Sequence, residues 1–434
     1  MSRSLIDLRK GHPAARHLPH ARLAKASLGA ATRLTRASEA EFPLNYCSDP
    51  MGTRRFRRSL GKYLSGAYGA PVSSRWLLTT NGVSHGLDLA TAALTSPGDT
   101  VIVEDPTYFL VHGIFRDHRL SIESIRGGKG GLDVDALERR CADHTKPTPK
   151  LLYLVPTHGN PSGASLSVEA RKKLVSLANT HGFYILADEV YQLLDWTAGG
   201  ASPRLLTYDA QYMRFAHSRS TGDASDADAD ADRDDDIAAY TSAGAASGAE
   251  ADDGARVLSV SSFTKILSPA LRLGWIEAAP SLLKRIAARG YLISGGGVAP
   301  YVSEVVSELL ESGEQAAHVA ELCARYKASC SALCHAMREK NRTRGRQMFD
   351  FVEPTGGYFC WVRIDGYDGG SDALLAAAER NGVSFLPGHR CMLDGKTLGT
   401  CARLCFAYEE TEHMPEAVKR LAGSVLTGGT TLDF

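Results

Sequence analysis

The stretch SSFTKILSPALRLGW, residues 261–275, is the most informative part of this chain. It begins where the apolar run 257–260 ends, and such a run between turn residues is typical of a buried parallel strand. Lys265 therefore lies just beyond a strand end, which is where open α/β sheets bind their ligands. The stretch predicts an α/β fold with a lysine at its ligand-binding edge.

Three other apolar runs predict further buried strands, at 101–104, 151–155 and 183–187. Stretches of helical period alternate with them, at 84–94 and 168–180. Strands that alternate with helices predict a doubly wound α/β domain, with a mostly parallel central sheet between layers of helices. We place this large domain at residues 47–285.

The pattern changes after Pro280. A long stretch of helical period at 299–340 is followed by two shorter predicted strands and a helix near the end of the chain. This order predicts a smaller α+β domain, which we place at residues 286–434. We expect the N-terminal segment 1–46 to pack beside that small domain.

The chain has 49 basic and 49 acidic residues, but the acids are unevenly distributed. Residues 217–255 contain ten Asp and one Glu against two Arg, which leaves 38 acids and 47 bases elsewhere. The segment has almost no large apolar side chains, so we expect a disordered acidic insertion, with partner binding as the alternative. The basic remainder suits anionic small molecules and does not require nucleic acid as a partner.

The nine cysteines form no CxxC pair and show no zinc-ligand spacing, so no metal site is expected. An odd number of structural thiols favours a reducing compartment. No apolar run reaches the length of about 18 residues that a membrane span needs. We expect a cytoplasmic protein, with mitochondrial import as the alternative because residues 8–38 contain bases and no acid.

Seven segments, in order along the chain, resemble those of the fold-type-I pyridoxal-phosphate enzymes of the class I/II aminotransferase family, and within it the 2-aminoadipate and aromatic aminotransferases. They are NGVSHG (81–86), DPTYF (105–109), PTHGNPSG (156–163), ADEVY (187–191), SSFTKILSPALRLGW (261–275), PTGGYFCW (354–361) and ARLCF (402–406). The resemblance covers nearly the whole chain apart from 217–255. It implies a homodimer that uses pyridoxal 5'-phosphate and acts on an amino acid and a 2-oxo acid.

The resemblance also implies roles for the residues around the cofactor ring. Lys265 would hold the cofactor as a Schiff base and would move the Cα proton of the substrate as base and acid. Asp188, just after the run 183–187, would keep the pyridine nitrogen protonated. Tyr108 would stack on the ring and complete the catalytic set, while Asn160 and Tyr191 would contact its phenolic oxygen.

A phosphate site is implied at the start of the helical stretch 84–94, where backbone amides meet an anion favourably. Its residues would be Gly82, Val83, Ser84, Ser262 and Arg272. Val83 stands where relatives usually have Ser or Thr, which removes one side-chain contact. Tyr46 resembles a tyrosine that family members donate to the phosphate from the neighbouring subunit.

Substrate would be bound by Arg403, which suits the α-carboxylate, by Asn160, and by the backbone of Gly11. The glycine run 294–300 is a candidate substrate loop, and Arg9, Arg16 or Arg22 could meet a side-chain carboxylate if they are not simply exposed. The implied reaction is ping-pong transamination. The same cofactor also serves C–S β-lyases, decarboxylases and 1-aminocyclopropane-1-carboxylate synthases, and these alternatives stay open. A non-enzymatic cofactor-binding regulator is less favoured, because family-like sequence begins near residue 5.

Overall fold

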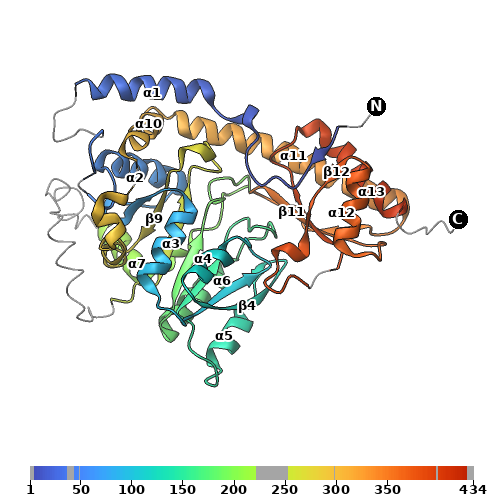
Figure 1. The fold of residues 1–434 in the computed structure, drawn as a ribbon, viewed down its shortest axis with the longest axis horizontal. Helices are drawn as coiled ribbons and strands as arrows, with labels where there is room; N and C mark the ends of the chain where they lie inside the picture. Colours follow the sequence, from blue (N-terminus) through green and yellow to red (C-terminus); the bar gives the residue numbers. More distant parts are fainter. Residues whose placement is uncertain are drawn as a thin grey trace.

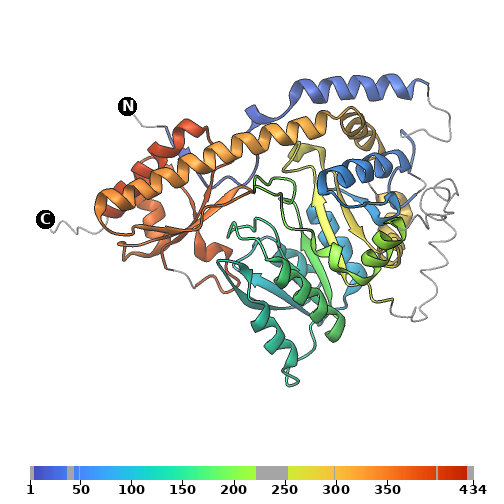
Figure 2. The same ribbon diagram turned by 180° about the vertical axis from the view of Figure 1, so that it is seen from behind.

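The computed structural model describes residues 4–36, 44–47, 49–220, 253–297, 299–396 and 399–427. Two lobes are visible in Figure 1, one around a large sheet and one around a smaller sheet that carries the C-terminal part of the chain. The long helix α11 (Glu314–Arg344) runs from the large lobe along the small one, as Figure 2 shows from behind.

An eight-stranded sheet forms the core of the large lobe, in the order β2-β9-β8-β7-β6-β3-β4-β5. The strands are β2 (Leu77–Thr80), β3 (Thr100–Asp105), β4 (Ser121–Gly128), β5 (Gly131–Leu132), β6 (Leu151–Leu154), β7 (Tyr184–Asp188), β8 (Val257–Ser262) and β9 (Gly274–Ala278). The neighbouring strands from β8 to β4 are parallel, whereas β9 is antiparallel to β8 and β2, and β5 to β4. The prediction of a mostly parallel sheet is confirmed. All four strands expected from apolar runs are present, because buried parallel strands need apolar side chains on both faces.

Helices cover both faces of this sheet (Figure 1). They are α2 (Arg54–Tyr68), α3 (Val83–Leu94), α4 (Val111–Asp117), α5 (Val134–Ala142), α6 (Val168–His181), α7 (Ala210–Ser220) and α9 (Pro280–Ala287). Local sequence sets their ends: the hydroxyl of Ser167 accepts a hydrogen bond from the Ala170 amide at the start of α6, and Gly182 ends that helix at φ 74°.

The predicted start of the acidic insertion at residue 217 is wrong. Residues 217–220 are the last turn of α7, in which the hydroxyl of Ser220 donates to the carbonyl of His217 at 2.8 Å. Packing overrides composition here, because the ring of Phe215 lies 5.2 Å from that of Trp76 and holds the helix on the large lobe. Residues 221–252 of the predicted insertion lie outside the described residues.

The small lobe contains an antiparallel sheet in the order β10-β11-β14-β13. Its strands are β10 (Phe349–Phe351), β11 (Phe359–Ile364), β13 (Leu386–Pro387) and β14 (Cys401–Cys405), and its helices are α11, α12 (Gly370–Arg380) and α13 (Met414–Thr427). The expected helical stretch 299–340 is two helices, α10 (Pro300–Glu311) and α11, because Gly313 adopts φ 78° between them. No helix among the described residues is long and apolar enough to cross a bilayer.

The N-terminal segment has two parts. Strand β1 (Ile6–Asp7) pairs in parallel with β12 (Val383–Ser384), which attaches the start of the chain to the small lobe. Helix α1 (His20–Leu34) lies along α10 (Figure 1). Its buried residues are Ala26, Ala30 and Leu34. The connection between β1 and α1 contains Arg9, Gly11 and His12, which line a cavity described below.

Candidate active site

A cavity of about 440 Å³ opens at the carboxyl ends of β7 and β8, between the two lobes. Eleven of the thirteen predicted site residues line it: Gly11, Val83, Ser84, Tyr108, Asn160, Asp188, Tyr191, Ser262, Lys265, Arg272 and Arg403. Gly82 does not line the cavity but lies close to the Arg272 guanidinium, and Tyr46 lines a different cavity. Residues from seven separate segments of sequence thus converge on one space.

Lys265 lies in the turn after β8, and its ammonium group reaches into the cavity. Nζ donates to the carbonyl of Gly11 at 2.6 Å, and the hydroxyl of Tyr358 donates to the carbonyl of Lys265 itself at 2.8 Å. Loss of solvent around the amine, together with the nearby charge of Arg403, lowers the pKa of Lys265 to about 8. A substantial fraction of the amine is therefore neutral, and nucleophilic, near neutral pH.

Asp188 is the last residue of β7 and is buried at the floor of the cavity. Its Oδ2 accepts a 3.0 Å hydrogen bond from the hydroxyl of Tyr153, whereas Oδ1 is buried without a partner of ordinary geometry among the described residues. Burial raises the pKa of Asp188 to about 6, although Tyr153 and the amide of Val190 oppose that rise. A buried carboxylate oxygen without a partner fits a protonated ring nitrogen, which would stabilise its charge.

Arg403, on β14, joins the two lobes at the cavity. Nη1 donates to Oδ1 of Asn160 at 2.9 Å, and Nη2 donates to the carbonyl of Arg9 at 2.7 Å. The guanidinium lies 4.1 Å from the ring centre of Phe359. This support fixes the plane of a planar fork that can bind a carboxylate with two hydrogen bonds.

The start of α3 and the side chain of Arg272 form an anion site. Gly82 precedes the helix at φ 82°, a conformation that favours glycine, and a Cβ atom there would lie 2.8 Å from Nη2 of Arg272 and displace the guanidinium. That group is held by the carbonyls of Asn81 at 3.1 Å and Pro269 at 3.2 Å. Free amides at the helix start and a guanidinium beside them suit a phosphate. Val83 contributes no hydroxyl to this site.

Two tyrosines complete the wall around Asp188. Tyr108 is partly buried, and burial raises the pKa of its phenol. Tyr191 is fully buried, and its ring packs 5.5 Å from Tyr358 and 6.0 Å from Phe359. Both phenols are therefore protonated near neutral pH and can donate hydrogen bonds into the cavity.

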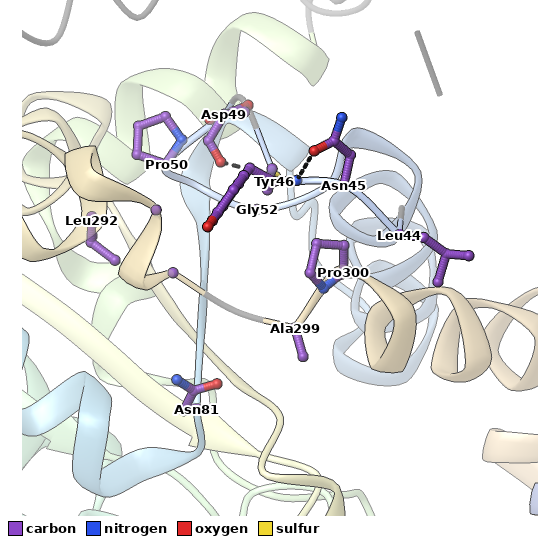
Figure 3. A pocket seen from close by; sticks show the side chains of 13 residues that line it. Leu44, Asn45, Tyr46, Asp49, Pro50, Gly52, Asn81, Leu292, Ala299 and Pro300 are labelled. Atoms are coloured by element: carbon purple, nitrogen blue, oxygen red, sulfur yellow. Dashed lines mark hydrogen bonds between the residues drawn. The ribbon is translucent and has the colours of Figure 1, made fainter. Parts of the chain in front are cut away.

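Tyr46 lies on a second cavity, of about 470 Å³, which also includes Asn81 (Figure 3). Its side chain is 84% exposed and does not line the cavity of Lys265. Four residues of the glycine run 294–300 line this second cavity as well: Gly295, Gly297, Ala299 and Pro300. None of the described residues of the run lines the cavity of Lys265, so within one subunit they do not form the substrate loop that the sequence suggested. Asn81 directly precedes Gly82, so the second cavity adjoins the anion site.

Several wall residues were missed by the sequence interpretation, among them Phe109, Leu110, Phe359 and Leu386. Phe359 lies in PTGGYFCW, a segment that resembles the family but from which the sequence analysis assigned no residue to the site. Pairing of β11 with β14 places Phe359 opposite Cys405 and therefore diagonal to Arg403 on one face. The period of two in these strands was the signal that could have identified it.

Comparison with known proteins agrees with this geometry. The sequence profile described as "Aminotransferase class I and II" matches residues 4–421. Aromatic-amino-acid aminotransferase 1 of Thermococcus litoralis is 25% identical over 378 residues, which are 86% of this chain and 78% of that protein.

Two solved structures have the same fold. The multiple substrate aminotransferase of Thermococcus profundus has a TM-score of 0.78 at 24% identity, over 99% of this chain and 92% of that chain. The α-aminoadipate aminotransferase of Thermus thermophilus, solved with N-(5'-phosphopyridoxyl)-L-leucine, has a TM-score of 0.73 at 23% identity, over 98% of this chain and 92% of that chain.

Proposed function

Because the chain belongs to the class I and II aminotransferases, and is therefore a pyridoxal-phosphate enzyme, we propose that it moves an amino group between an L-amino acid and a 2-oxo acid. The reaction would follow a ping-pong mechanism, and Lys265 would carry the cofactor. One observation carries the proposal: Lys265, Asp188, Arg272 and Arg403 line the same cavity. They are the amine, the acid and the two anion-binding groups that this chemistry requires.

The cofactor, when bound, withdraws electrons from the substrate and makes its Cα proton removable. Asp188 would hold the ring nitrogen, and the α3 start with Arg272 would hold the phosphate. Arg403 would bind the α-carboxylate and orient the Cα–H bond. Lys265, with its lowered pKa, would accept that proton as a base and then donate it as an acid later in the reaction.

We further propose a homodimer in which Tyr46 serves the site of the other subunit. Its high exposure and its position on a cavity next to the anion site support this assignment. The names of the relatives suggest two candidate classes of substrate, aromatic amino acids and the dicarboxylic 2-aminoadipate. A cytoplasmic location stays a prediction from the sequence.

A panel of amino donors, each offered with pyruvate, 2-oxoglutarate or a neutral 2-oxo acid, tests the proposed reaction. We expect paired products, a new amino acid and a new 2-oxo acid, in equal amounts. Release of ammonia and a 2-oxo acid from a single substrate, or of carbon dioxide, would instead identify a lyase or a decarboxylase on the same cofactor.

A further inference from the structure

Outside the residues assigned to the cofactor, the cavity wall has an apolar part beside the polar side chains of Arg9, His12, Thr264 and Arg403. Phe109, Leu110, Phe359 and Leu386 contribute this part. Leu386 pairs with Arg403 across β13 and β14, and Phe359 lies beneath the Arg403 guanidinium. Apolar side chains therefore surround the group assigned to the α-carboxylate, and the side chain of a bound substrate would contact them.

Three guanidinium groups line the cavity within the described ranges, those of Arg9, Arg272 and Arg403. Arg272 and Arg403 form no ion pair with a described acid, since backbone carbonyls and Asn160 hold them. They are therefore free for the phosphate and the α-carboxylate. Arg9 is the guanidinium left over, and the one that could bind a second carboxylate on a substrate side chain.

Arg9 is already neutralised by two acids of this chain. Asp7 accepts from Nε and from Nη2 of Arg9, each at 3.1 Å, in a bidentate pair. Glu379 accepts from the remaining nitrogen, Nη1, at 3.2 Å. Every nitrogen of the Arg9 guanidinium is thus engaged with a carboxylate.

Both acids are themselves fixed by secondary structure. Asp7 is 7% exposed and belongs to β1, which pairs with β12. Glu379, on α12, also accepts a 2.9 Å hydrogen bond from the hydroxyl of Ser384 on β12. Strand β1, strand β12 and helix α12 therefore place both carboxylates beside Arg9 at the cavity wall.

The other two N-terminal arginines suggested by the sequence cannot replace Arg9. Arg16 pairs with Glu410 and donates to the carbonyl of Tyr408. Arg22 pairs with Glu314 and Glu321 on α11. Neither residue lines the cavity.

We propose that Asp7 and Glu379 determine specificity: by neutralising Arg9 they restrict the site to substrates with a single carboxylate and an apolar or aromatic side chain. A second carboxylate would find no unpaired guanidinium in this part of the cavity, because Asp7 and Glu379 occupy that of Arg9, and burying an unpaired charge is costly. The two half-reactions share one site, so the restriction applies to the 2-oxo acid as well. This inference rests on the proposed function and narrows its substrates.

The wild-type holoenzyme tests the restriction with substrates matched in size. We expect kcat/KM for L-methionine and L-phenylalanine to exceed that for L-glutamate and L-2-aminoadipate by at least about a hundredfold. Equal or better use of the dicarboxylic donors would overturn the inference and leave the proposed function standing. If no donor of either kind reacts, it is the proposed function that fails.

Charge removal at the two acids tests their role directly. Asp7→Asn and Glu379→Gln should each raise the ratio of kcat/KM for L-2-aminoadipate to that for L-phenylalanine by about tenfold, and the double variant should raise it most. Glu379 has a side chain 40% exposed, so its variant is expected to fold even if Asp7→Asn does not.

Glu410→Gln is the matched control, since it frees Arg16, an arginine outside the cavity. The ratio should stay at the wild-type value in this variant. Unchanged ratios in Asp7→Asn and Glu379→Gln, or an equal change in Glu410→Gln, would overturn the assignment.

Binding of unreactive acids to the holoenzyme gives a second readout. By calorimetry we expect 3-phenylpropanoate to bind the wild-type enzyme more tightly than glutarate does, and Asp7→Asn with Glu379→Gln to tighten glutarate by about tenfold. If glutarate bound the variants no more tightly than the wild type, the freed Arg9 would not be its binding partner, which would contradict the inference.

Discussion

The ammonium group of Lys265 donates a 2.6 Å hydrogen bond to the backbone carbonyl of Gly11, 254 residues away in the sequence. The N-terminal segment is therefore part of the active-site wall. A Cβ atom on Gly11 would lie 3.0 Å from the ring of Phe359 and 3.5 Å from Nη2 of Arg403, so the backbone here lies against the groups assigned to the substrate.

Substitution of Gly11 by Val should therefore impair substrate binding and leave the cofactor site intact. The branched side chain would displace Phe359 and Arg403, and we expect kcat/KM to fall by at least about tenfold. Steady-state kinetics and the visible spectrum of the bound cofactor measure the two effects. Gly66→Ala is the control, because a Cβ at Gly66, on the exposed side of α2, has nothing within 4 Å. Equal kinetics in Gly11→Val and Gly66→Ala would contradict the close approach.

Replacement of Lys265 by Ala should abolish both turnover and the visible absorption band of the bound cofactor. The cofactor's covalent attachment requires an amine, and no other described lysine lines the cavity. Absorption spectra after dialysis against excess pyridoxal phosphate, with Lys284→Ala on the surface helix α9 as a control, provide the measurement. An unchanged band in Lys265→Ala would place the cofactor elsewhere.

The lowered pKa of Lys265 predicts how cofactor uptake depends on pH. Only the neutral amine attacks an aldehyde, so the second-order rate constant for uptake by the apoenzyme should rise with pH and level off above about 8. An ordinary lysine would keep gaining rate up to about pH 10.4. Stopped-flow absorbance between pH 6 and 10 distinguishes the two curves, and continued growth beyond pH 9 would show that the amine is not desolvated.

Burial of Asp188 predicts that the folding stability of the apoenzyme falls as the pH rises. Its pKa is raised from 3.8 to about 6 on folding, so its protonated form favours the folded state and that contribution is lost as pH rises from about 4 to above 6. A shift of this size corresponds to about 3 kcal/mol. The stability of wild-type apoenzyme relative to Asp188→Asn should fall by this order over the interval, as chemical denaturation would measure.

The cofactor should remove that pH dependence, because a positive ring nitrogen beside Oδ1 would stabilise the carboxylate. In the holoenzyme the wild type should be the more stable of the two across the interval. Asp188→Asn should also lose at least about a hundredfold in kcat, since its amide cannot hold the ring protonated. A variant with near wild-type kcat would remove Asp188 from the mechanism.

Sequence was sufficient for the parts of the fold and site that depend on local pattern. The runs before Asp188 and Lys265 are apolar on both faces, so they predict parallel strands, and parallel strands carry their last residues to one edge. Helix α7 illustrates the limit: 217–220 were assigned to the acidic insertion by composition, but the contact of Phe215 with Trp76 keeps them helical.

The neutralisation of Arg9 could not have been predicted. Asp7 is only two residues away, but Glu379 is 370 residues away and reaches Arg9 only because β1 pairs with β12. From sequence alone Arg9, Arg16 and Arg22 were equivalent candidates for a side-chain carboxylate. Long-range strand pairing decides which arginine faces the cavity and whether that arginine already forms an ion pair. A local sequence pattern does not show such pairing.

Exchange of subunits tests the proposed role of Tyr46. If Tyr46 contacts the phosphate bound in the other subunit, Tyr46→Glu should prevent cofactor retention by like-charge repulsion in every homodimer that contains it. Lys265→Ala homodimers are inactive for a different reason. In a mixed dimer, the subunit with an intact Lys265 receives its Tyr46 from the Lys265→Ala subunit, so one of the two sites is complete. Co-refolding equal amounts of the two inactive variants should therefore restore about a quarter of the wild-type activity. If Tyr46 acted within its own subunit, both sites of the mixed dimer would lack one group, and no activity would return.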